Sequence, residues 1–232
     1  MGKLTWKHLV VINVVIVLLI VGGYYLYMSV GASYTYKKHV AKGQTFLREE
    51  NWKAAVAEFA AAAKIRPESY DPHYGAGAAL LKLRVVDRAA MALENAVRIN
   101  PESAEAHYSL GISYHRMKKF DLAMREYQQV LRLNPQAFQV YNSIGALYQA
   151  QGEHEKAIEI YRKAYEIKPD YFITFFNVGS AYEAMGKKED AIKTYKEAIT
   201  FVEKTAGDMR IKAEAEKRIA RLQGKKASSG KK

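Results

Sequence analysis

Three histidines are the side chains of this sequence whose type and spacing first suggest chemistry. His39, His73 and His107 follow one another at intervals of 34 residues, and imidazole is the commonest metal ligand among side chains. The ligands of one zinc ion each lie about 2 Å from the metal, whereas packed helices lie about 8–10 Å apart. Three histidines that lie on three different repeating units are therefore too far apart to bind one metal ion. We interpret them as packing residues.

No other constellation predicts catalysis or a bound cofactor. The chain has no cysteine, which excludes thiolate ligands, cysteine nucleophiles and disulfides. Its glycines in the predicted helices stand singly rather than in a phosphate-binding loop. Glu153 and Glu155 lie at a predicted turn, where carboxylates favour the start of a helix. We expect no enzyme activity, no metal and no cofactor.

The 34-residue interval runs through most of the chain. Glycine recurs with this step at Gly43, Gly77, Gly111, Gly145 and Gly179. Proline recurs with it at Pro67, Pro101, Pro135 and Pro169. Bulky residues follow the same step at Phe59, Leu93, Tyr127, Tyr161 and Tyr195. One period held by several residue types indicates a stack of supersecondary units, each buried by its neighbours.

Each unit is predicted to be a pair of helices. In the third copy His107, Gly111 and Tyr114 share one helix face, because a helix turns by about 100° per residue. Ala123 and Tyr127 form the facing stripe of a second helix, which the glycine allows to approach closely. The proline then ends that helix because it cannot donate to the preceding turn.

This pattern resembles the tetratricopeptide repeat family. The resemblance implies an all-α fold, an α-solenoid of five helix-turn-helix repeats. The residues on either side of the repeats add one N-terminal membrane helix and a C-terminal capping helix to this prediction. The expected repeats are residues 36–69, 70–103, 104–137, 138–171 and 172–205. The expected flanking segments are a basic N-tail at 1–8, an anchor at 9–28, a linker at 29–35, the cap at 206–223 and a basic disordered tail at 224–232.

The segment from Leu9 to Met28 is predicted to cross a membrane. It contains no charged residue, and about 20 apolar residues span a hydrocarbon core of about 30 Å. A cleaved signal peptide is the alternative, with Lys3 and Lys7 as its basic region. The short basic N-tail favours an orientation in which the repeats are extracytoplasmic. The layout resembles that of the anchored tetratricopeptide proteins of bacterial envelopes, which implies an inner-membrane protein with its repeats in the periplasm. The opposite orientation, with the repeats in the cytosol, stays open.

The net charge of +12 is concentrated at the C-terminal end. Residues 206–232 contain nine Lys and Arg against three acidic residues, whereas the five repeats together have a net charge of only +4. We therefore expect protein partners rather than nucleic acid. The alternatives are a polyanion binder that uses this basic end on nucleic acid or anionic lipid, and a structural spacer that forms homo-oligomers.

The resemblance also implies a concave groove lined by one flank of each first helix. The residues expected to line this peptide groove are Val40, Gln44, Leu47, Tyr74, Leu81, Tyr108, Ile112, His115, Gln139, Asn142, Gln149, Phe176, Ser180 and Glu183. Such a lining suits a peptide with aliphatic or aromatic side chains, with amides that bind its backbone. The predicted function is a membrane-anchored adaptor that binds protein or peptide partners and assists the assembly or stabilisation of membrane or envelope complexes.

Overall fold

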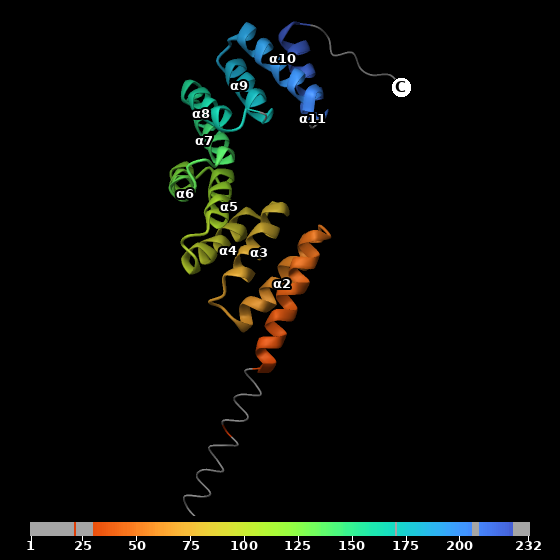
Figure 1. Cartoon of the computed structure of the whole chain (residues 1–232), viewed down its shortest axis with the longest axis vertical. Coiled ribbons are helices and arrows are strands. Elements are labelled where there is room, and N and C mark those ends of the chain that lie inside the picture. Colours follow the sequence, from red (N-terminus) through yellow and green to blue (C-terminus); the bar gives the residue numbers. More distant parts are fainter. Residues whose placement is uncertain (1–20, 22–29, 170, 206–208, 225–232) are drawn as a thin grey trace, which may run out of the picture. The chain divides into compact units, whose positions relative to one another are not determined.

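The computed structural model describes residues 21, 30–169, 171–205 and 209–224. All regular secondary structure in these residues is helical, which confirms the all-α prediction. The chain divides into two compact units, Met1–Pro101 and Glu102–Lys232. Figure 1 shows the helices of the first unit in orange to yellow and those of the second in green to blue.

In the first unit, four helical segments follow one another. Residues 30–48 are helical, and they are followed by α2 (Trp52–Ile65), α3 (Tyr70–Lys82) and α4 (Val86–Ile99). Helix α3 packs on both α2 and α4. The segment expected to be a linker, 29–35, is helical from residue 30 onward and continues without a break into the helix that ends at residue 48, because no proline interrupts it.

The second unit consists of seven helices within its described residues, each packed on the next. They are α5 (Ala104–Arg116), α6 (Phe120–Leu133), α7 (Phe138–Ala150), α8 (His154–Ile167), α9 (Ile173–Ala184), α10 (Lys188–Thr205) and α11 (Met209–Leu222). Helix α10 has 18 residues where α8 has 14. It extends further because Glu203 stands where the other repeats have proline.

The recurring glycines lie against the recurring bulky residues. A Cβ atom on Gly111 would lie 2.5 Å from Cε1 of Tyr127, and one on Gly179 would lie 2.8 Å from Cδ1 of Tyr195. These distances are shorter than van der Waals contact, so only glycine allows the two helices of a pair this separation. The rings themselves are fully buried. They form the core of each helix pair.

The turn between the two helices of each repeat contains one residue in the left-handed conformation. In the fourth and fifth repeats this residue is Gly152 or Gly186, which adopts it without a Cβ clash. In the first three repeats it is Glu50, Arg84 or Lys118, with φ between 56° and 60°. Each of these three residues therefore has a backbone conformation that glycine adopts more readily.

The predicted membrane segment, residues 9–28, lies outside the described residues except for Val21. Within the part of the chain that the structure describes, no helix combines the length and apolarity needed to cross a bilayer.

Candidate functional site

The evenly spaced histidines make separate contacts within the fold. Nδ1 of His39 lies 2.6 Å from a carboxylate oxygen of Glu58, and Nδ1 of His107 lies 2.6 Å from one of Glu126. His73 instead contacts the carbonyl oxygen of Pro67 at 2.6 Å. In the described ranges, no group of three or more His, Cys, Asp or Glu side chains could hold a metal. These contacts bind neighbouring helices and turns together.

A wide hollow lies on the second unit, where the first helices of its repeats come together. It has a volume of about 770 Å³. Its walls come from α5, α6, α7, α9 and the adjoining turns: Tyr108, Ile112, His115, Arg116, Lys118, Phe120, Tyr127, Gln139, Asn142, Ser143, Ala146, Ala150, Tyr171 and Asn177. Five residues of the predicted groove line it, namely Tyr108, Ile112, His115, Gln139 and Asn142. We call it the first hollow.

Aromatic rings form one wall of the first hollow. The rings of Tyr108 and Tyr127 lie 6.1 Å apart at 44°, and His115 meets Phe120 edge-on at 6.0 Å. The hydroxyl of Tyr108 forms a hydrogen bond of 3.1 Å with that of Ser143 on α7. This bond joins two successive first helices. The wall is therefore apolar and held in place on both sides.

The charges that line the first hollow are positive. Arg116 and Lys118 line it, and no Asp or Glu is among its lining residues in the described part of the chain. Burial, together with the Arg116 guanidinium, lowers the pKa of His115 below its ordinary 6.5. This imidazole is therefore neutral at neutral pH. The hollow combines apolar walls with two permanent cations, so it favours an occupant that carries a negative charge.

Two buried polar side chains in the wall differ in how they are bonded. Asn142 donates to the carbonyl of Phe138 and accepts from the hydroxyl of Thr174 at 3.1 Å. It joins α7 to α9, and most of its amide is used inside the fold. The hydroxyl of Tyr127 is buried and forms no hydrogen bond of normal geometry among the described residues, although the nearby Ser143 side chain offsets part of the rise in its pKa. Burial raises the pKa of Tyr127, so this hydroxyl stays protonated.

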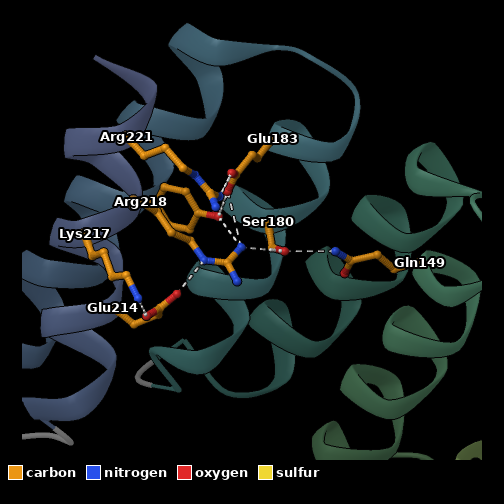
Figure 2. Close-up of polar contacts among 8 residues, drawn as sticks. Gln149, Ser180, Glu183, Glu214, Lys217, Arg218 and Arg221 are labelled. Carbon is orange, nitrogen blue, oxygen red and sulfur yellow. Dashed lines mark hydrogen bonds and ion pairs between the residues drawn. The ribbon is translucent and has the colours of Figure 1, made fainter. Parts of the chain in front are cut away.

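Three of the other predicted groove residues of this unit, Phe176, Ser180 and Glu183, contact the capping helix α11. Arg218 of α11 is stacked over the ring of Phe176 at 5.1 Å. Its Nη1 atom donates to Ser180, to Glu183 and to the hydroxyl of Tyr195, over 3.1 to 3.3 Å. Figure 2 shows the contacts of Arg218 with Ser180 and Glu183, together with the amide of Gln149, which donates to Ser180 at 3.1 Å. Gln149, Phe176, Ser180 and Glu183 are thus bonded within the chain.

Glu183 is the centre of this cluster. Burial alone would raise its pKa, but the hydrogen bond from Tyr195 and the ion pairs with Arg221 and Arg218 outweigh burial and lower it below 4.5. Burial and the adjacent carboxylate raise the pKa of Tyr195 to about 12. The cluster is therefore an anion held between two guanidinium groups. It fastens α11 to α9.

The five predicted groove residues of the first unit lie in different surroundings. Val40 is buried and packs with Tyr36 and Ala62. Leu47 packs against the Ala55 and Phe59 cluster. The remaining three are exposed Gln44, half-buried Leu81, and Tyr74, whose ring stacks on that of Tyr70 at 5.5 Å.

Sequence reasoning missed several residues of the first hollow. Ser143 and Asn177 occupy the sixth position of their repeats, beside the positions considered. Because the sixth position adjoins the fifth on the helix, the groove prediction could have included both residues. Arg116 and Lys118 lie at the end of α5 and in the turn after it, outside the helical register that predicted the groove.

Comparison with known families matches the chain to two models described as tetratricopeptide repeat. One matches residues 102–170 and 136–204, and the other matches 40–104 and 74–126. The chain belongs to the tetratricopeptide repeat family, as the spacing predicts. No curated protein sequence matches it significantly.

Solved structures with the same fold include several of MamA. A crystal structure of MamA protein is 27% identical, covers 75% of this chain and 95% of its own, and has a TM-score of 0.66. MamA from Desulfovibrio magneticus RS-1, residues 41 to the end, is 20% identical over 73% of this chain and 96% of its own, with a TM-score of 0.67. YrrB, described as a TPR protein with an unusual peptide-binding site, is 20% identical over 77% of this chain and 90% of its own, with a TM-score of 0.60.

Proposed function

We propose that this protein is a scaffold that binds a peptide segment of a partner protein in the first hollow. The observation that carries this proposal is the lining itself, which combines rings, amides and two cations without an acidic residue. A volume of about 770 Å³ suits several side chains of an extended or helical segment. YrrB, which has the same fold, is described as having a peptide-binding site, and this supports the choice of ligand class.

The lining indicates the chemistry of the segment. Tyr108, Ile112 and Phe120 offer apolar surface to an aliphatic or aromatic side chain. Arg116 and Lys118 favour a carboxylate beside it. Gln139 and Ser143 place polar side-chain groups in the same lining, where they face the backbone of a bound segment. The ligand is therefore an apolar residue flanked by an acidic one.

The turn position of Lys118 is distinguished by its surroundings rather than by its backbone. Its φ of 58° is shared by Glu50 and Arg84 at the same turn position of the first two repeats. Of these three residues, Lys118 places its side chain in the lining of the first hollow. Its ammonium group is therefore available to a carboxylate of a bound segment.

Capture of partners by the full chain tests this function. The chain and two variants are used to capture proteins from native membranes, and the captured proteins are quantified by mass spectrometry. We expect Ile112→Glu, which places a negative charge in the first hollow, to lower capture of its specific partner at least about tenfold. Gln44→Glu adds the same charge on the exposed surface of the first unit and should leave capture unchanged. Equal capture by all three proteins, with helical circular dichroism retained, would refute the proposed function.

We also propose that residues 9–28 anchor the protein in a bacterial inner membrane with the repeats in the periplasm. The uncharged length of this segment supports the proposal. A reporter that is active only outside the cytoplasm, fused after Lys232, should be active in whole cells. Activity only of a cytosolic reporter would reverse the orientation, and release of the protein by a salt wash would refute the anchor.

A further inference from the structure

A second hollow lies between α8, α9 and α10 and shares no lining residue with the first. Its volume is about 620 Å³. Three rings form its floor: Tyr165 meets Phe175 edge-on at 5.1 Å, and Phe175 stacks on Phe201 at 5.8 Å. Tyr165 is 41% exposed although it is a large aromatic residue. The floor thus offers aromatic surface to a neighbouring molecule.

Lysines surround this floor on one side of α10. Lys193, Lys196 and Lys204 line the hollow, and Glu197 is its only acidic lining residue in the described part of the chain. All three lysines are exposed. No ion pair engages any of them among the described residues. Their charge is therefore not neutralised within the fold.

The shape and charge of the second hollow select one class of occupant. A bilayer is a broad surface, whereas these rings lie in a recess between three helices that a protruding side chain reaches. A nucleic acid strand would stack successive bases on several exposed rings, but Tyr165 is exposed whereas Phe175 and Phe201 are half-buried and stack on each other. An apolar side chain that enters the recess, with carboxylates beside it, satisfies both the floor and the lysines.

We propose that the second hollow is a separate docking site for an acidic protein segment that carries an aromatic side chain. The site is independent of the first hollow, so one chain can hold two protein segments. The three rings supply contact area, and the lysines supply charge complementarity and a fast, salt-dependent association.

A label placed in the second hollow tests this proposal. The chain has no cysteine, so Thr200→Cys, at an exposed position of the hollow, carries a single environment-sensitive fluorophore. The probe is a 12-residue peptide in which one phenylalanine stands among aspartates and glutamates. Its matched controls replace the acids by lysine or the phenylalanine by alanine. The full chain, purified in detergent, is titrated with each peptide.

We expect the acidic aromatic peptide to change the fluorescence with an affinity at least about tenfold above that of either control. Lys193→Glu with Lys196→Glu should lower this affinity at least about tenfold. Lys187→Glu with Lys188→Glu, the same charge change where α10 begins, should not. Ile112→Glu in the first hollow should leave the response intact, which separates this site from the proposed function.

Three results would overturn the proposal. The first is equal affinity for the acidic and the basic peptide, and the second is an affinity that does not change when Lys193 and Lys196 are replaced by glutamate. The third is a fluorescence change that only phosphatidylserine vesicles or single-stranded RNA produces. The last result would assign the lysines to a lipid surface or to a nucleic acid.

Discussion

Gly111 faces the ring of Tyr127 so closely that a Cβ atom added to the glycine would lie 2.5 Å from Cε1 of that ring. The ring is fully buried between α5 and α6, so it cannot move into solvent. The same tyrosine lines the first hollow. One contact therefore sets the separation of a helix pair and shapes the wall of the candidate site.

Gly111→Ala should destabilise the protein. The added methyl group displaces a buried ring, and such overpacking costs about 1–3 kcal/mol, more than the helix propensity of about 1 kcal/mol that alanine gains over glycine. Gly31→Ala is the matched control, since nothing lies within 4 Å of its Cβ position. It should be neutral or stabilising by up to about 1 kcal/mol. Urea denaturation measures both, and a stable Gly111→Ala would contradict this packing.

The paired helices could be predicted because one period relates each glycine to one ring. Glycine, ring and proline all repeat at the same step, and each has a single physical reason to do so. The helical start at residue 30 could not be predicted in this way. Residue 30 lies before the first copy of the repeat. No equivalent position in another copy therefore shows where a helix should begin.

Tyr127 and Tyr161 occupy the same position of successive repeats, but loss of the hydroxyl should change the stability of the protein differently at the two positions. Tyr161 donates to the side chain of Gln149 at 3.1 Å, whereas the buried hydroxyl of Tyr127 forms no hydrogen bond of normal geometry among the described residues. Tyr161→Phe should therefore cost about 1 kcal/mol of unfolding free energy. Tyr127→Phe should cost nothing or stabilise. The urea midpoints of the two variants compare them directly, and an equal loss in both would mean that the Tyr127 hydroxyl is satisfied in solution.

Lys118→Gly should raise stability and lower partner binding together. Glycine relieves a φ of 58° at a gain of about 1 kcal/mol, while the ammonium group at the rim of the first hollow is lost. Arg84→Gly relieves a φ of 60° at the same turn position of the second repeat. It should raise the melting temperature without changing capture. If capture by Lys118→Gly equals that of the unchanged chain, Lys118 has no part in binding.

Acid should loosen the capping helix through Glu183. The pKa of this carboxyl is lowered in the folded chain, so its stabilisation is complete above the ordinary value of 4.5 and is lost as the pH falls through the folded-state value. Glu183→Gln removes that contribution. The difference in stability between the two proteins should be constant near neutrality and shrink below pH 4.5. Hydrogen exchange of α11 measures it, and a difference that grows in acid would reverse the assignment.

The candidate site was only partly predictable from the sequence. Tyr108 and Asn142 were found because a groove residue recurs at a fixed helical position. That rule placed Phe176 and Glu183 in the groove as well, where Arg218 instead contacts both. Arg218 lies in α11, beyond the repeats, and periodicity carries no information about it. Lys118 could not be predicted for a related reason. It lies in a turn, and the helical spacing that predicted the groove applies only to residues within a helix.

Site-specific photo-crosslinking tests the central claim most directly. A photoreactive amino acid replaces Ile112 in the first hollow or Glu159 on the exposed surface of α8, and the full chain is irradiated in native membranes. We predict one dominant protein adduct from position 112, with the crosslinked partner segment carrying an apolar residue beside an acidic one, and no such adduct from position 159. Equal adducts from both positions, or none from position 112, would contradict the account.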